Sequence, residues 1–207
     1  MTASLLRLLA AAAVYGFSIG ASHSWLYAAR NLVKFPLLIL ATAAICAVAY
    51  AVLARFLAAP LGLLQVQRTV LAVFRDLAVL LAALSPVSFF LARTIRRPNG
   101  ADLAEYPFFL LLNTAAIAMC GCLAVARQAR HLRTSGCGGS LVAGLLTGWM
   151  ALSLFAGGQC AWLLRPFFGA SPTVDASPPW FAFQRLDDRG AGSFFEAVWN
   201  AIRALGR

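Results

Sequence analysis

Long apolar segments separated by short polar stretches dominate the pattern along the chain. A helix needs about 20 mostly apolar residues to cross a hydrocarbon layer of about 30 Å, and it satisfies its own backbone hydrogen bonds in lipid. Segments of about this length, the first somewhat short, cover residues 8–22, 35–54, 77–92, 106–126 and 141–164. The pattern therefore predicts an all-α fold, an integral membrane bundle of about five transmembrane helices.

Two further stretches are amphipathic rather than uniformly apolar. In the first, residues 61–77, Arg68 and Arg75 lie one heptad apart on nearly the same helical face, with apolar residues on another flank. We expect an interfacial helix here, leading into the third span. In the alternative, one helix crosses continuously from residue 61, and Arg75 and Asp76 become intramembrane charges and candidates for function.

The second amphipathic stretch lies at the C-terminus. Ser193 and Glu196 have the spacing of a capping box, and apolar residues then recur at helical intervals, at Phe195, Val198, Trp199, Ile202 and Leu205. A helix this short cannot span, so we expect it to lie on the membrane or to dock on the bundle. Residues 1–169 would then form the transmembrane bundle, and residues 170–207 an extramembrane tail rich in proline and aromatic residues.

The start of the chain allows two interpretations. Arg7 precedes a short apolar core with small residues near its end, which fits either a cleavable signal or a retained first helix. Gly16 and Gly20 form a small-xxx-small pair that lets a neighbouring helix approach. In the second span, Pro36 is expected in the first turn, where its missing N–H costs nothing.

Polar residues inside the spans are candidates for intramembrane contacts. Gln159 follows Gly157 and Gly158, which form a weak point in the fifth helix, and near mid-membrane it needs a partner inside the protein. The expected partners are Ser85, Asn113 and Thr114, and Arg75 and Asp76 join these candidates if they lie in the membrane. Pro86 is expected to kink the third span.

The end of the fifth span combines aromatic and basic residues. Trp162 and Phe167 suit the membrane–water boundary, and Arg165 precedes Pro166, which disfavours helical geometry in the residue before it. The candidates for structural or partner-binding contacts are therefore Gly157, Gly158, Gln159, Trp162, Arg165, Pro166, Phe167 and Gly169. The simpler alternative for each of them is that it anchors the bundle in lipid.

The composition is typical of a membrane protein and does not favour nucleic acid, metals or cofactors as ligands. Hydrophobic residues make up 61% of the 207 positions and charged residues only 12%, against about a quarter in soluble domains. The net charge of +10 comes from short basic clusters between apolar runs, so nucleic acid is not an expected partner. The five cysteines include no CxxC pair and the two histidines lie far apart, so we expect no metal and no cofactor.

No catalytic motif stands out in the chain. GxSxG, HExxH and phosphate-binding glycine loops are absent, and only Asp76 of the seven acidic residues is close to a span. We therefore expect no catalytic residues and no enzyme. The leading hypothesis is a scaffold or accessory subunit that binds another membrane protein or itself. The alternative is a small homo-oligomeric channel or transporter, in which Gln159 and the two glycines would interrupt a helix.

Three short motifs support a resemblance. The pattern GxQxAWxLRPFxGxP is carried by Gly157, Gln159, Ala161, Trp162, Leu164, Arg165, Pro166, Phe167, Gly169 and Pro172. With KFPLLIL at 34–40 and LAALSPVSFF at 81–90, it resembles an uncharacterised family of bacterial polytopic membrane proteins, although the tail is longer than the family's connection. That family has no established activity to transfer, and a looser likeness to YIP-type five-helix proteins is architectural only.

The expected location is the bacterial inner membrane, crossed several times. Five spans place the termini on opposite sides, and the basic residues near the membrane are divided equally between the two sides. Arg7, before the first span, favours a cytoplasmic N-terminus, which would put the tail around Trp180 outside. We expect labelling of Cys137 by an impermeant thiol reagent to report on this orientation.

Overall fold

A computed structural model describes residues 2–21, 24–94, 105–167, 180–181 and 191–205. Within these residues it contains seven helices and no strand. Five segments are long and apolar enough to cross a membrane, namely Ala3–Gly20, Trp25–Phe56, Leu63–Thr94, Pro107–Thr134 and Gly139–Leu163. The expected all-α bundle with about five spans is confirmed, and the protein is a multi-pass integral membrane protein.

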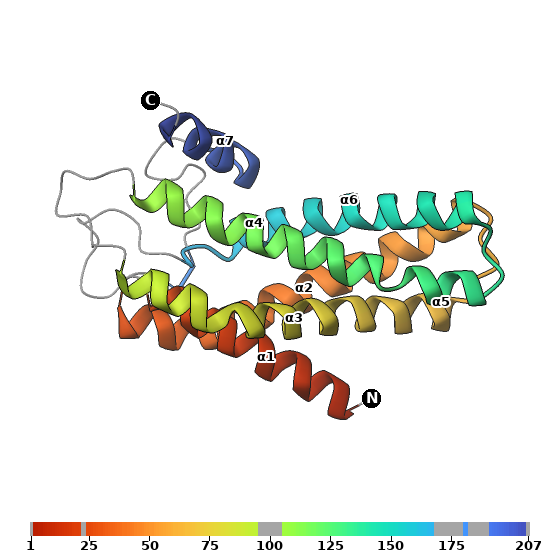
Figure 1. Cartoon of the computed structure of the whole chain (residues 1–207), viewed down its shortest axis with the longest axis horizontal. Coiled ribbons are helices and arrows are strands. Elements are labelled where there is room, and N and C mark those ends of the chain that lie inside the picture. Colours follow the sequence, from red (N-terminus) through yellow and green to blue (C-terminus); the bar gives the residue numbers. More distant parts are fainter. Residues whose placement is uncertain (1, 22–23, 95–104, 168–179, 182–190, 206–207) are drawn as a thin grey trace.

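Four long segments set the axis of the bundle (Figure 1). They are α2 (Trp25–Phe56), α3 (Leu63–Thr94), α4 (Glu105–Ala126) with the short α5 (Ala129–Thr134) after it, and α6 (Gly139–Leu163). At one end of the bundle lie the α2–α3 turn, α5 and the start of α6. The opposite end holds the start of α2 and the end of α6, and the site described below is built there.

The two remaining helices lie on the outside of this framework. The first, α1 (Thr2–Gly20), packs along α2 and α3, and its amino end stops short of the α2–α3 turn (Figure 1). The last, α7 (Phe194–Leu205), packs against α4 and α6. One half of the capping box predicted for α7 is present, because the Glu196 N–H donates to Ser193 Oγ at 3.3 Å. The Glu196 carboxylate accepts from the N–H of Gly192 at 2.8 Å, one residue before the expected donor Ser193.

The glycine pair of α1 lets this helix approach α2 backbone to backbone, as expected. A Cβ atom on Gly20 would lie 2.7 Å from the carbonyl oxygen of Tyr27, and one on Gly16 would lie 2.6 Å from Cβ of Phe35. The apolar stripe of α1 is fully buried against its neighbours, at Leu8, Ala12, Tyr15 and Ile19. α1 is therefore packed as a member of the bundle.

α2 begins well before the apolar run that predicted it. Ser24 caps the helix, and its Oγ accepts a hydrogen bond from the Tyr27 N–H at 3.3 Å. Pro36 consequently lies inside the helix and not in its first turn, so that expectation is wrong. The helix extends through the polar residues Arg30, Asn31 and Lys34 because two of them, Asn31 and Lys34, turn into the protein and are buried.

α3 is one unbroken helix, so a separate interfacial helix over residues 61–77 is not formed. The physical reason is an apolar stripe that continues without interruption through this region, at Val66, Val70, Val73, Phe74, Leu77, Ala78 and Leu81, all of them buried. The polar residues lie on the other side of the helix. The helix is therefore continuous, as in the alternative, and Arg75 and Asp76 belong to a helix long and apolar enough to span. That the two charges lie inside the membrane stays a prediction.

The middle of the core joins α2 to α6. Trp149, fully buried, stacks on Tyr50 with 4.6 Å between ring centroids and 4° between ring planes. The Tyr50 hydroxyl donates to the Trp149 carbonyl at 3.2 Å and also contacts Ser153 Oγ. A buried hydroxyl is thus satisfied by a carbonyl oxygen inside α6, which can accept a second hydrogen bond. This contact fixes the position of α6, which carries the predicted site residues Gly157, Gly158, Gln159 and Trp162.

Candidate functional site

Two polar side chains of α2 hold the segment that follows α6. Asn31 Nδ2 donates to the carbonyl oxygen of Phe167 at 2.7 Å, and Lys34 Nζ donates to that of Pro166 at 3.1 Å. Both side chains are buried, with exposed fractions of 0% and 2%. Pro166 and Phe167 lie beyond the end of the helix, so their carbonyl oxygens need hydrogen-bond donors from elsewhere in the protein. The pattern residues at the end of the fifth span are therefore fixed by α2.

Lys34 has unusual surroundings for a lysine. Its ammonium lies 5.3 Å from the centroid of the Phe181 ring and makes one hydrogen bond, to Pro166. Within the described residues, the ion pair Arg75–Asp76 is the only salt bridge, so no carboxylate there neutralises Lys34. An ammonium carries three N–H donors. This buried cation therefore retains donors that no described residue of the chain accepts.

Aromatic rings lie over three arginines described at this end of the bundle. The Arg165 guanidinium lies 3.7 Å from the centroid of the Trp162 ring, which is three residues before it. Arg30 lies 5.2 Å from the Trp180 ring, and Arg93 lies 5.3 Å from the Trp25 ring. Cation–π contacts of this kind are worth about 0.5–1 kcal/mol at exposed positions. Trp162 and Arg165, both predicted to act at the membrane boundary, thus form a single unit.

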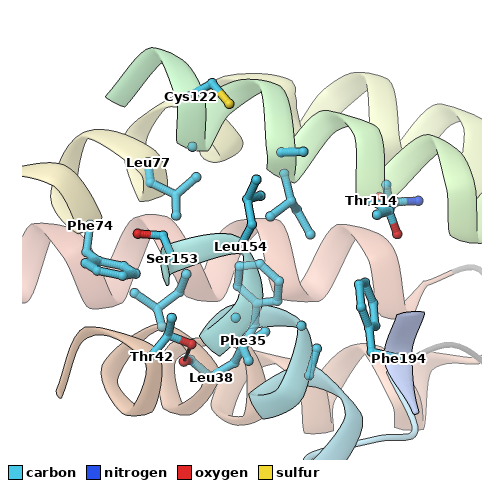
Figure 2. Close-up of a pocket in the computed structure, with 18 of the residues that line it drawn as sticks. Phe35, Leu38, Thr42, Phe74, Leu77, Thr114, Cys122, Ser153, Leu154 and Phe194 are labelled. Carbon is cyan, nitrogen blue, oxygen red and sulfur yellow. Dashed lines mark hydrogen bonds between the residues drawn. The ribbon is translucent and has the colours of Figure 1, made fainter. Parts of the chain in front are cut away.

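A cavity of about 150 Å³ lies between the helices and is lined by Phe35 and Phe167 at one place in its wall (Figure 2). Its walls come mainly from α2, α4 and α6, with Phe194 of α7 and Phe167 also contributing. The lining is almost entirely apolar, and its polar side chains are largely occupied by the protein itself. Thr42 Oγ1, for example, donates to the Leu38 carbonyl oxygen at 2.8 Å. A cavity of this size with an apolar lining stays dry and accepts small apolar groups.

The two glycines of the fifth span are used within the chain. A Cβ atom on Gly158 would lie 2.8 Å from Cδ1 of Phe194, and one on Gly157 would lie 3.7 Å from Cγ2 of Thr42. Gly158 therefore admits α7, while Gly157 lies on the cavity wall facing α2. The weak point expected at these glycines is not seen, because α6 continues as a helix through both. Whether they also bind a second protein stays a prediction.

Gln159 does not make the contacts expected of it. Among the described residues, Asn113 and Ser85 use their side chains elsewhere, and no hydrogen bond joins Gln159 to them or to Thr114. Gln159 lies only four residues before the end of α6 at Leu163, which is about 6 Å along the axis. The half-buried amide is therefore close to the membrane boundary, where headgroups and water can satisfy it, and not near mid-membrane.

Asn113 joins two helices, as expected of an intramembrane polar residue. Its Oδ1 accepts a hydrogen bond from the Tyr15 hydroxyl of α1 at 2.9 Å, and its Nδ2 donates to the Phe109 carbonyl oxygen at 2.8 Å. Thr114, its neighbour, lies on the cavity wall (Figure 2). Ser85 bonds only within α3, to the Leu81 carbonyl oxygen at 3.3 Å. Of these three candidates, Asn113 alone makes a contact between helices.

Arg75 and Asp76 form an ion pair on the outer side of α3. Arg75 Nη2 and Nε lie 2.9 and 3.2 Å from Asp76 Oδ1. The exposed fractions of the two side chains are 41% and 19%. The described residues give the pair no other hydrogen-bond partner. The pair does not line the cavity, although Phe74 and Leu77 on either side of it in the sequence do.

Part of the predicted site cannot be placed, and part of the observed site was not predicted. Gly169 lies outside the described residues, as does Pro172. Asn31, Lys34 and Tyr15 were missed as contact residues. The signal for Lys34 was available, because it is the only lysine of the chain and lies four residues before Leu38, on the same face of a helix.

Comparisons with protein-family models, with curated proteins and with solved structures find no match to this chain.

Proposed function

We propose that the protein is a non-catalytic component of the bacterial inner membrane, a scaffold or accessory subunit that binds a second membrane protein or another copy of itself. The observation that supports this function is the partly exposed ion pair of Arg75 and Asp76. The proposal includes a cytoplasmic N-terminus, for which an experiment is given below.

The position of the pair makes it costly unless something covers it. Residues 75 and 76 lie near the middle of α3, which has 32 residues and is therefore about 48 Å long. Insertion of an arginine or aspartate at the centre of a membrane helix costs roughly 2.5–3.5 kcal/mol. Pairing removes the net charge, but it leaves further donors of Arg75 and one oxygen of Asp76 without a partner in the described residues. A polar group from another membrane protein would satisfy them.

The residues around the pair suit contact with another helix. An outward stripe of α3 continues from Arg75 in steps of three and four residues, through Arg68, Leu71 and Val79. Leu71 and Val79 are 38% and 50% exposed, respectively. Spacing of this kind lets one helix dock along another. Polar contacts between membrane helices typically contribute about 0.6 kcal/mol each and up to about 1.7, so the pair would provide specificity and the apolar residues contact area.

The test replaces both charges in the full-length protein. R75L/D76L removes the pair and its unsatisfied groups together, a change that is often neutral or stabilising for the fold. We expect the variant to insert and fold but to lose a stoichiometric partner, or self-association, in mild-detergent purification and chemical crosslinking. V87L is a matched control, because Val87 is also exposed on α3 but lies off the stripe.

Two results would contradict this function. The first is retention of the same partner by R75L/D76L at wild-type stoichiometry. The second is flux of ions or small solutes through the purified wild-type protein in liposomes, which would indicate a channel or transporter instead.

A further inference from the structure

We propose that Lys34 and the adjacent cavity form one binding site for an anionic membrane lipid, with the headgroup at Lys34 and an acyl chain in the cavity. This site lies at a different place from the ion pair on α3, so its test is independent of the proposed function. Three observations support it: the alignment of the residues on α2, the buried cation, and the shape and chemistry of the cavity.

The alignment follows from the helical repeat. Lys34, Leu38 and Thr42 recur at intervals of four residues, so they lie one above another on the same face of α2. Leu38 and Thr42 line the cavity, and Lys34 lies one turn beyond it. Phe35 follows Lys34 in the chain, and Phe167 follows Pro166, which accepts the hydrogen bond from Lys34. Both phenylalanines line the cavity as well. One end of the cavity therefore lies next to the helical turn that carries Lys34.

The buried cation calls for an anion. A charged group in a site of low dielectric is strongly unfavourable unless it is paired and hydrogen-bonded, and Lys34 is only 2% exposed. Arg30 lies one turn before Lys34 on the same face of α2, and like charges at this spacing destabilise a helix. A phosphate or carboxylate beside Lys34 would accept its remaining N–H donors and relieve the repulsion. Lys34 differs in this respect from an interfacial lysine, which extends its ammonium into the headgroup layer.

The cavity has the properties expected of a site for an acyl chain. Its lining is apolar, and its volume of about 150 Å³ matches engineered cavities that bind small hydrocarbons. It therefore accepts a short part of an acyl chain, with the rest of the chain in the bilayer. Gly121 contributes open space, because a Cβ atom there would meet nothing within 4 Å. Phe194 of α7 closes one side of the cavity (Figure 2).

The experiment measures lipid binding to the purified full-length protein in mild detergent by native mass spectrometry. The probes are long-chain phosphatidylglycerol, phosphatidylcholine with the same chains, and inorganic phosphate. We expect the wild type to bind phosphatidylglycerol about tenfold or more tightly than phosphatidylcholine, as hydrogen bonds to a charged group imply. K34M should abolish this preference, while K34R should retain it. R55M, which removes an exposed cation at the far end of α2, should leave it unchanged.

The cavity is tested by filling it. G121L places a side chain in the open space and should weaken binding of both long-chain lipids, whereas G139L, in α6 and with nothing within 4 Å of its Cβ, should not. This pair of variants decides the question even if K34M does not fold, because neither substitution touches Lys34. Equal binding of the two lipids to the wild type would overturn the proposal, and so would an unchanged preference in K34M. Displacement of phosphatidylglycerol by inorganic phosphate with equal ease in wild type and G121L would assign Lys34 to free phosphate and also overturn it.

Discussion

At the scale of single residues, Gly16 occupies the tightest contact between α1 and α2. A side chain there would overlap the Asn31 carbonyl oxygen and would lie 2.6 Å from Cβ of Phe35. Both are atoms of, or directly attached to, the backbone, so they cannot move away as the end of a flexible side chain can. Asn31 in turn holds the Phe167 carbonyl oxygen. The same helical turn therefore supports the contact between α1 and α2 and one wall of the cavity.

This contact predicts a large difference between two identical substitutions. G16A should destabilise the bundle by about 1–3 kcal/mol, the usual cost of overpacking. G121A should be neutral or stabilising by up to about 1 kcal/mol, because its Cβ meets nothing within 4 Å and alanine favours a helix more than glycine does. The measurement is unfolding in mild detergent on addition of SDS, followed by tryptophan fluorescence. Equal stability of the two variants would show that α1 and α2 are not packed this closely.

The residue types alone did not show which of the two side chains, Gln159 or Lys34, is buried. Both are polar residues near apolar runs, and the sequence favoured Gln159 as the buried one. The structure reverses this, because Lys34 is buried and Gln159 is only half-buried. Both lie near the same end of the bundle, since Lys34 donates to Pro166 just beyond the end of α6. Burial of Lys34 therefore depends on the packing of the segment after α6, which hydrophobicity does not reveal.

At the scale of helices, the spans were predictable and their ends were less so. Apolar runs located all five spans because only a helix satisfies its backbone in lipid. The sequence divided residues 61–92 into an interfacial helix and a span, and this was wrong. Arg68 and Arg75 indicate an interfacial helix only if the opposite face has no apolar stripe that can pack against the bundle. Here Val66, Val70 and Val73 supply such a stripe. The face of α7 that docks on the bundle was also unpredictable. Some of the apolar residues of α7, among them Trp199 and Ile202, remain exposed and do not take part in docking.

The docking of α7 depends on the space that Gly158 leaves. A methyl group there would lie 2.8 Å from the Phe194 ring, and Phe195 stacks on Phe155 of α6 with 5.9 Å between centroids. G158A should therefore weaken docking by about 1 kcal/mol and accelerate hydrogen exchange in α7 on the order of fivefold. G157A is the matched control, because its methyl group would lie 3.7 Å from Thr42, an ordinary contact. Exchange rates in α7 that are the same in both variants would argue against docking through Gly158.

At the scale of the whole molecule, the basic side chains at the two ends of the bundle differ in exposure and in their contacts with aromatic rings. At the end that holds the α2–α3 turn and α5, the arginines are exposed, and they are Arg55, Arg68, Arg127, Arg130 and Arg133. At the other end Lys34 is buried, Arg30 and Arg165 are half-buried, and Arg93 is exposed; the three arginines each lie over an aromatic ring. Among the described residues, the exposed arginines are therefore concentrated at the first end. Exposed arginines favour the first end as the cytoplasmic one.

This asymmetry predicts a cytoplasmic N-terminus, and a pair of introduced cysteines tests it. Cys137 is unsuitable as a reporter, contrary to the sequence-based expectation, because it is only 5% exposed and would resist labelling from either side. Ser140, in the first turn of α6, and Thr94, the last residue of α3, are both exposed and lie at opposite ends of the bundle (Figure 1). In spheroplasts, an impermeant maleimide should label T94C directly and S140C only after permeabilisation. The reverse pattern would place the exposed arginines outside and with them the N-terminus, since α1 runs parallel to α3 and begins on their side of the bundle (Figure 1).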